Sequence, residues 1–430
     1  MPNKSKNLLN ARRNGDYILP NGELEKNTRY TGGRNSNITV LGASGTGKTY
    51  GYIAPTVLSG SGGSSMIISD TKGTLHGLCK EPLEEMGYDV ILLDYIDPAA
   101  SEGHYNFLEH PETPNDIQKL SNMIAYLGLK KEAVRDPFWL QNEVMFLNSV
   151  LGYLMEEEKG FGRTVDGLFR LMMTFDADAL ANGKPCDASR VFERHKEIYK
   201  KRTGKDSWAY RQFKKFVGLS DKTFSTVLIS AYADLCSFDT PEMCEMASQS
   251  DFDVLSIAEK KTAVFINVSD TDRSKDTAVN IFYTQVMDKL CRYADSLPEK
   301  HLPVPVRFIL DDFGTAAKIE GFEGMISNIR SRGISVALVL QTIAQLEQGY
   351  GTGAKTILAN CSTKLYMGGS DPDTANYVSS LTNKMTETIL NMPLMTHWLI
   401  RQGAPPSFGK TVLLHEYELD ERKYAEQEHF

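Results

Sequence analysis

The feature that most constrains this chain is the octapeptide Gly42–Ala–Ser–Gly–Thr–Gly–Lys–Thr49, which lies between an apolar run and a predicted helix. It matches the pattern G-x-x-x-x-G-K-[ST] at every fixed position. Glycines let consecutive backbone N–H groups curl around a phosphate, and the positive end of the following helix faces the same anion. A chance match among 34 glycines is the competing interpretation, but the strand–loop–helix context argues against it. The octapeptide therefore predicts a site for the phosphates of a nucleotide.

Each position of this loop has an expected role. Lys48 is expected to reach the β- and γ-phosphates, and the hydroxyl of Thr49 is expected to bind Mg²⁺. The rest of the loop surrounds the phosphates through its backbone; the residues concerned are Gly42, Ser44, Gly45, Thr46 and Gly47. ATP and Mg²⁺ are thus the expected cofactors.

Short apolar runs rich in β-branched residues recur on both sides of a long interruption. They occupy residues 38–42, 65–70 and 88–94 before it, and 262–268, 306–312, 335–341, 363–369, 397–402 and 411–416 after it. Their alternation with longer segments is typical of an α/β fold with a mainly parallel sheet.

Within the interruption the helical period dominates. Residues 143–158 carry apolar side chains at three- and four-residue spacing, namely Val144, Leu147, Leu151 and Leu154. We therefore expect an α/β domain interrupted by an all-α domain. The expected boundaries are an irregular N-terminal arm at 1–35, a nucleotide-binding motor domain at 36–111 and 236–430, and the all-α domain, for cargo or DNA recognition, at 112–235.

A phosphate loop needs an acidic partner on a neighbouring strand to complete the Mg²⁺ shell. The apolar run at 306–310 ends in Asp311 and Asp312, which suit metal binding and water activation respectively. Gln341 ends the next run, where a γ-phosphate sensor would lie. Arg330 and Arg332 precede that run, and a guanidinium there suits an arginine finger, although solvated surface arginines are the plainer interpretation.

This set of motifs resembles the conjugative coupling proteins of type IV secretion systems, the TraG/TraD-type ATPases. The resemblance runs in order from about residue 36 to 416, and its longest blocks are ILDDFGTAAKIEGFEGMISNIRSRGISVALVLQTIAQLE and ILANCSTKLYMGGSDPDTANYVS. Shorter blocks are NITVLGASGTGKT, SMIISDTKGTL, YDVILLDYIDP, HYNF and KTAVFINVSDTDRS.

The resemblance implies a RecA-like motor domain with an inserted all-α domain, assembled as a homo-hexamer. Such rings use ATP to pass a relaxase–DNA complex or effector proteins into a secretion channel. By position, Lys48 and Thr49 match the Walker A pair, Asp311 the Walker B aspartate, Gln341 the sensor and Arg330 a finger that acts on the neighbouring subunit. Asp70 and Lys72 match a family motif on the strand beside the loop.

Two departures from the family pattern affect these expectations. The family usually has Glu where this chain has Asp312, and the shorter carboxylate motivates an alternative function: a nucleotide-gated docking adaptor that recruits cargo and hydrolyses ATP slowly. Most members also begin with transmembrane helices, whereas no stretch here approaches about 18 apolar residues. We expect a cytoplasmic chain, either a fragment or a membrane-less member, recruited to the inner face of the membrane by the channel or a separate anchor protein.

The formal net charge of −8 argues against bulk coating of nucleic acid, yet one segment departs from this average. Between residues 190 and 222 eleven Lys or Arg face four acids, a local charge of +7. Candidate contacts with single-stranded DNA, or with a relaxase or accessory protein, are Lys200, Lys201, Arg202, Lys205, Arg211, Lys214 and Lys215. Interleaved aromatic residues such as Phe213 could stack on bases; the competing interpretation is a solvated basic face with those aromatics in the core.

Overall fold

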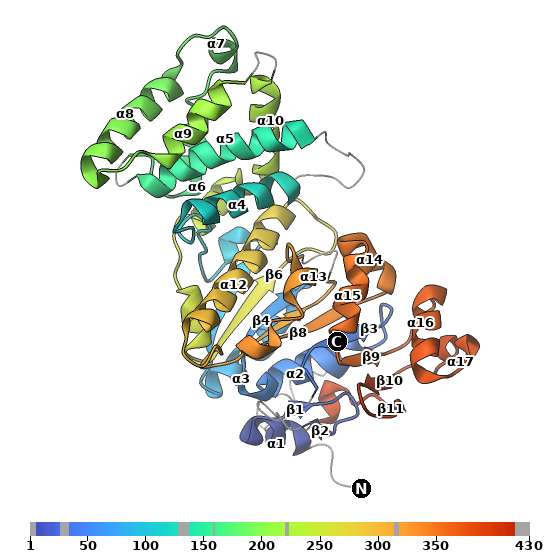
Figure 1. The fold of residues 1–430 in the computed structure, drawn as a ribbon. Helices are drawn as coiled ribbons and strands as arrows, with labels where there is room; N and C mark the ends of the chain where they lie inside the picture. Colours follow the sequence, from blue (N-terminus) through green and yellow to red (C-terminus); the bar gives the residue numbers. More distant parts are fainter. Residues whose placement is uncertain are drawn as a thin grey trace. The chain divides into compact units, whose positions relative to one another are not determined.

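The apolar runs of the sequence become strands of one nine-stranded sheet (Figure 1). The computed structural model describes residues 6–25, 34–127, 137–157, 160–219, 223–313 and 318–417. The chain divides into two compact units. The first comprises Met1–Ile96, Asp253–Thr271 and Val286–Phe430 and contains the sheet; the second comprises Asp97–Phe252 and Asp272–Gln285.

The strand order of the large sheet is β11-β10-β9-β3-β8-β7-β4-β6-β5. All neighbours from β9 to β5 are parallel, whereas β10 runs antiparallel to β9 and β11. The strands are β3 (Ile38–Leu41), β4 (Ser65–Asp70), β5 (Asp89–Asp94), β6 (Thr262–Asn267), β7 (Val306–Leu310), β8 (Ile334–Leu340), β9 (Thr363–Tyr366), β10 (Thr396–Arg401) and β11 (Ser407–Lys410). The mainly parallel sheet expected from the sequence is thus confirmed.

One strand prediction is wrong. Residues 411–416 were expected to form a strand, but the edge strand β11 ends at Lys410 and residues Leu414–Glu416 form a 3₁₀ turn. The amide of Val412 donates to the carbonyl of Pro20 instead of to a strand partner. Leu414 is buried in the core beside the sheet, so its apolar side chain is explained by packing and not by strand alternation.

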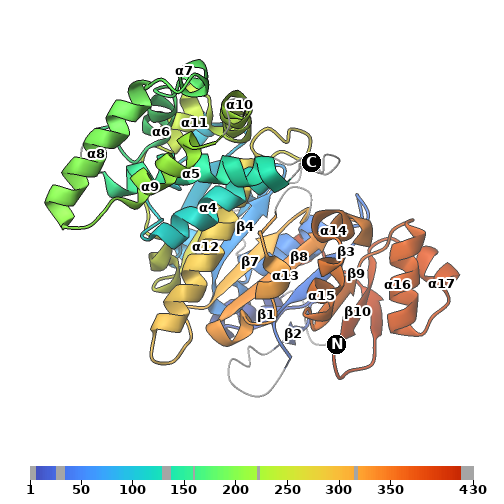
Figure 2. The ribbon, with the colours of Figure 1, turned by 45° about the horizontal axis from the view of Figure 1, so that its top comes forward.

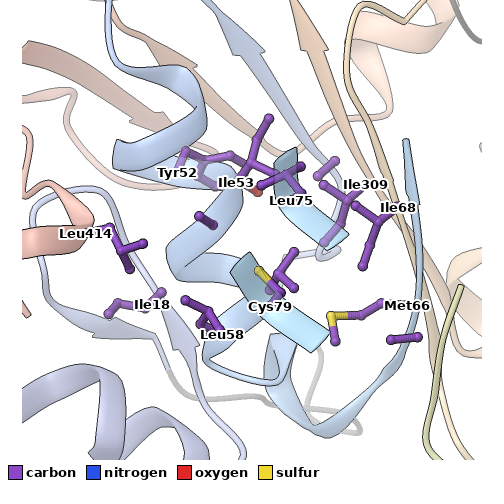
Figure 3. Packing of buried hydrophobic residues seen from close by; sticks show 14 of the residues in the cluster. Ile18, Tyr52, Ile53, Leu58, Met66, Ile68, Leu75, Cys79, Ile309 and Leu414 are labelled. Atoms are coloured by element: carbon purple, nitrogen blue, oxygen red, sulfur yellow. The ribbon is translucent and has the colours of Figure 1, made fainter. Parts of the chain in front are cut away.

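Helices cover both faces of this sheet (Figures 1 and 2). One face packs against α1 (Asn7–Asn14), α2 (Ala54–Leu58) and α3 (Thr74–Glu85), which share a buried cluster with alternate side chains of the strands. Figure 3 shows part of this cluster, including Ile53, Leu75, Ile68 and Ile309. On the other face lie α13 (Phe322–Met325), α14 (Ile343–Tyr350) and α15 (Gly353–Ala359), while α16 (Pro372–Thr382) and α17 (Thr386–Leu390) follow β9. Burial on two faces explains the continuous apolar runs.

The first residues are not an irregular arm. Those described include α1 and a two-stranded ribbon, β1 (Tyr17–Ile18) and β2 (Leu24–Glu25). Leu8 and Ala11 of α1 are fully buried, and Ile18 joins the same core cluster. Their few apolar side chains, spaced for one helix face, outweigh the polar composition that suggested an unstructured lead-in.

The regular elements among the described residues of the second unit are all helices. Its helices are α4 (Pro114–Leu127), α5 (Pro137–Glu156), α6 (Val165–Met172), α7 (Ala177–Ala181), α8 (Asp187–Thr203), α9 (Trp208–Val217), α10 (Phe224–Asp234) and α11 (Pro241–Met246), and the long α12 (Asp276–Ser296) contributes its first half. Among the residues that the structure describes, no helix is both long and apolar enough to cross a membrane.

A buried carboxylate joins three of these helices. Glu156 ends α5, and its Oε2 lies 2.9 Å from Nε2 of His195 on α8 and accepts a 2.6 Å hydrogen bond from Ser207. Its Oε1 accepts from the backbone N–H groups of Trp208 and Ala209, at 2.8 and 3.3 Å. Burial acts to raise the pKa of Glu156, but these hydrogen bonds outweigh it and lower the pKa. The ionised carboxylate therefore stabilises the start of α9.

We expect Glu156→Ala to lower the free energy of unfolding by about 3 kcal/mol, because buried donors lose their charged partner. Since the folded-state pKa lies below the ordinary 4.5, this stabilisation is complete above that pH and is lost as the pH falls through the lowered pKa. Urea unfolding followed by circular dichroism at neutral and acidic pH measures both effects. The exposed Glu197→Ala on α8 is the matched control, and an equal loss in that variant would contradict the assignment.

Candidate functional site

The glycine-rich loop leaves the carboxyl end of β3 and is anchored to the strands on either side. The N–H of Gly42 donates to the carbonyl of Leu340 on β8, and the N–H of Ala43 donates to that of Gly368 after β9. Gly45 and Gly47 have φ angles of +79° and +87°, which favour glycine. Ser44 and Gly45 are exposed, so the loop presents its backbone to solvent as a phosphate cradle requires.

Lys48 is folded back onto this loop. Its Nζ donates to the carbonyl oxygens of Gly42 at 2.7 Å and Ala43 at 3.0 Å. Burial lowers the pKa of the ammonium, while the carboxylates of Asp311 and Asp312 act in the opposite direction. Thr49 follows at once and begins a π-helical turn, Thr49–Ile53, that continues into α2. The lysine and threonine thus lie together between the glycine-rich loop and α2.

Asp311 follows β7 and belongs to the same edge of the sheet. It was expected on a strand neighbouring the loop, but β8 lies between β3 and β7. Burial, then the nearby carboxylate of Asp312, raises the pKa of Asp311 to about 6. Its Oδ1 accepts from the N–H of Asp312 at 3.0 Å, and the hydroxyl of Thr71 lies 3.5 Å from its Oδ2. A cation at this carboxylate would relieve the cost of its ionisation.

Asp312 and Gln341 lie together at the end of the neighbouring strands β7 and β8. The Nε2 of Gln341 donates to Oδ1 of Asp312 at 3.2 Å, and the backbone N–H of Gln341 donates to the side chain of Gln345 at 2.7 Å. Asp312 has a φ of +47°, in the left-handed region that aspartate tolerates better than most residues. Its carboxylate is therefore directed by backbone geometry as well as by the glutamine.

Asp70 has a structural task at this edge. β4 lies between β7 and β6, so the expectation that Asp70 and Lys72 flank the loop is wrong: β8 and β7 separate β4 from β3. The buried carboxylate of Asp70 accepts from the backbone N–H groups of Lys72, Leu75 and His76, and thereby caps the start of α3. Lys72 is exposed.

Arg330 lies at the opposite end of the sheet. It is exposed in a 3₁₀ turn, Arg330–Arg332, that immediately precedes β8, whereas Gln341 follows the same strand. Seven strand residues separate the two ends by about 20 Å. Arg330 is therefore remote from the loop of its own chain. Arg332 is held by a bidentate pair with Asp295, at 2.8 and 2.9 Å.

The basic residues singled out in the helical unit all lie at the surface. Two are partly engaged: Lys200 pairs with Asp206 at 3.1 Å, and Arg202 donates to the carbonyl of Glu156. The aromatic residues are less available than expected, because Phe213 is buried and stacks on Phe192 at 4.4 Å. The exposed residues lie at the end of α8, in the turn that follows and along α9: Lys200, Lys201, Arg202, Lys205, Arg211, Lys214 and Lys215.

Sequence reasoning missed Met395 and Thr411, whose side chains pack against glycines of the loop and of the helical turn that follows it. A Cβ on Gly47 would lie 3.1 Å from the sulfur of Met395, and one on Gly51 only 2.5 Å from Thr411. Neither residue belongs to a motif, so no local signal could have identified them. Thr71 was also missed, although it stands between Asp70 and Lys72, which the resemblance had singled out.

We expect Asp311→Asn to abolish Mg²⁺-dependent nucleotide binding while stabilising the nucleotide-free chain. Because the folded-state pKa is raised to about 6 from 3.8, ionisation of Asp311 destabilises the fold as the pH rises through this interval. Removing the charge should raise the melting temperature by about 1–3 °C at pH 8 and leave it unchanged near pH 4. Calorimetry at both pH values tests this, and an equal shift at pH 4 would contradict it.

The fold resembles the solved structures of the plasmid coupling protein TrwB and of VirB4. TrwB in complex with ADP and Mg²⁺ aligns with a TM-score of 0.66 at 20% identity, covering 93% of this chain and 89% of that chain. VirB4 of Thermoanaerobacter pseudethanolicus aligns with a TM-score of 0.54 at 15% identity over 93% of this chain and 97% of that chain. The expected class, a RecA-like P-loop fold with inserted helices, is thereby confirmed.

Curated relatives agree with this likeness. Protein VirD4 of Rhizobium rhizogenes is 25% identical over 371 residues, which is 83% of this chain and 50% of the relative, and conjugal transfer protein TraG of Escherichia coli is 22% identical over 79% and 54%. The chain therefore spans about half the length of these relatives. The profile of the family described as Type IV secretory system Conjugative DNA transfer matches residues 4–390. The chain belongs to this family of conjugative DNA-transfer proteins.

Proposed function

We propose that this chain is the ATP-driven motor of a coupling protein that delivers a relaxase–DNA or protein substrate to a type IV secretion channel during conjugation. The observation that carries the proposal is the constellation at the carboxyl edge of the sheet. Lys48, Asp311 and the Asp312–Gln341 pair belong to three adjacent strands that end side by side. Family membership and the ADP–Mg²⁺ complex of TrwB support the same assignment.

In this proposal each residue has one task. The loop from Gly42 to Gly47 and Lys48 hold the phosphates of ATP, while Thr49 and Asp311 hold Mg²⁺, which neutralises phosphate charge. Asp312 orients and deprotonates the attacking water, and Gln341 positions Asp312 and contacts the γ-phosphate. The raised pKa of Asp311 makes this carboxylate a place where a cation is favoured.

The position of Arg330 supports the assembly that we propose. About 20 Å of strand separates it from the ATP-binding edge of its own chain, so it serves as a finger only on a neighbouring subunit. We therefore place the chain in a homo-hexameric ring on the inner face of the membrane, docked on the channel directly or through an anchor protein. Single-stranded DNA, relaxase and accessory proteins are its partners.

We expect ATP hydrolysis to rise more steeply than linearly with protein concentration, because a complete site needs two subunits. Arg330→Ala should lower kcat about 10³-fold and leave nucleotide affinity unchanged. Each variant should be inactive or nearly so alone, but mixing Lys48→Ala with Arg330→Ala should restore activity. In mixed assemblies the Lys48→Ala subunit supplies Arg330 to the intact ATP site of an Arg330→Ala subunit. Arg332→Ala is the matched control, since Asp295 holds that side chain. Activity linear in protein, with no rescue on mixing, would count against the ring.

The second candidate function is a nucleotide-gated docking adaptor with weak hydrolysis. It is favoured by the short Asp312 side chain, whose Oδ1 accepts a hydrogen bond from Gln341. If the site is a competent motor, Asp312→Glu should change kcat less than about threefold. A gain of about tenfold or more would favour the adaptor. Single-turnover ATP hydrolysis measures the change, with Lys48→Ala as the blank.

We expect Lys214→Glu/Lys215→Glu to weaken binding of single-stranded DNA and to flatten its salt dependence by about 1.4 in slope, because two phosphate contacts are lost. The matched control is Lys119→Glu/Lys184→Glu, which makes the same charge change at exposed positions elsewhere in the helical unit. Fluorescence anisotropy at several salt concentrations measures both slopes. Equal effects in the two variants would show that net charge alone is responsible.

A further inference from the structure

A cavity of about 690 Å³ lies at the edge of the sheet opposite the glycine-rich loop. Its walls include Ile38 and Thr363, which begin β3 and β9, and Arg307 near the start of β7. Parallel strands begin here and end at the nucleotide edge, so the cavity lies away from Lys48, Asp311 and Gln341 of the same chain. Its volume is that of a pocket for a nucleotide-sized molecule.

Arg307 is a buried cation without a counter-charge. Its side chain is 4% exposed; one terminal nitrogen donates to the carbonyl of Ser36 at 3.1 Å and the other to the hydroxyl of Tyr52 at 3.2 Å. The ring of Tyr17 lies 5.0 Å from the guanidinium carbon. The Nε–H has no hydrogen-bond partner, and no carboxylate of the described residues pairs with it. Burial acts to lower the pKa of this guanidinium, but the hydroxyl groups of Tyr52 and Tyr17 outweigh it and raise the pKa, so the cation persists in the folded chain with one N–H donor still unused.

The remaining charges on the cavity wall favour the same kind of occupant. Arg34 and Arg330 also line it, and Glu25 is the one acid among the described lining residues. The carboxylate of Glu25 pairs with Arg34, another lining residue, at 2.8 Å and approaches Arg401 at 3.6 Å. The described lining therefore carries three guanidinium groups and one carboxylate, a positive formal charge.

We propose that this cavity binds a phosphoryl group of a nucleotide-sized ligand, with Arg307 as its buried anchor. Guanidinium groups present planar pairs of donors that match phosphate oxygens, and the tyrosines supply flat walls for the rest of the ligand. The phosphoryl group has two possible sources. It belongs either to a free phosphorylated molecule or to the nucleotide of an adjoining subunit, and only the second source rests on the proposed ring.

The first experiment tests the site without the nucleotide edge. Inorganic pyrophosphate is titrated into Lys48→Ala at constant ionic strength, and thermal unfolding is recorded. We expect a saturable rise in melting temperature whose apparent affinity falls at least about tenfold when Arg307→Met is added. Arg292→Met, which removes an exposed charge paired with Asp288, is the control and should leave the affinity unchanged. If Arg307→Met does not fold, the exposed Arg34→Gln replaces it, with an expected loss of about threefold.

Absence of saturable stabilisation in Lys48→Ala, or an equal response with and without Arg307, overturns the proposal. A second experiment identifies the source by measuring ATP hydrolysis of Arg307→Met with Lys48 intact. If the neighbour supplies the phosphate, kcat falls and is rescued by mixing with Lys48→Ala; if a free molecule does, kcat changes less than about twofold. Because pyrophosphate binding requires no hydrolysis, this proposal and the proposed motor function can fail separately.

Discussion

The structure depends on one electrostatic constraint: like and unlike charges are gathered out of water at the carboxyl edge of a buried parallel sheet. Lys48 bends back to two carbonyl oxygens of its own loop, and Asp311 has its pKa raised by burial and by Asp312. Burial opposes the charge of both groups, and a bound phosphate and metal ion would offset that cost. The sheet, tied to the loop through Leu340 and Gly368, holds them there regardless.

Much of this arrangement could be predicted because its signals are local. Continuous apolar runs identify strands buried on two faces, and the pattern of glycines before Lys48 predicts the backbone conformation of the loop. The order of the strands could not be predicted in the same way. Nothing in the sequence of β7 says that β8 will lie between it and β3, because that order is determined by how the crossover helices pack.

The errors have equally specific physical causes. Leu414 belongs to an apolar run, but its side chain is buried in the core from a 3₁₀ turn and not from a strand. Leu8 and Ala11 are buried in the same core, and this packing stabilises a helix in a segment of polar composition. Asp70 resembled a site residue, but its carboxylate accepts from the backbone N–H of Lys72 and from those of Leu75 and His76 in the first turn of α3. Phe213 packs in the core, as the competing interpretation of the basic segment stated. In each case long-range burial overrides the local pattern.

The strand β8 has a mechanical consequence. It is hydrogen-bonded to β3 on one side and β7 on the other, so it moves only as part of the sheet. Gln341 follows its last residue and Arg330 stands just before its first. Any shift of Gln341 along the strand direction therefore moves Arg330 as well, because only the hydrogen-bonded strand and the short turn before it connect the two residues. The separation between this glutamine and this arginine is therefore fixed by the length of the strand, and it changes only if the sheet itself is distorted.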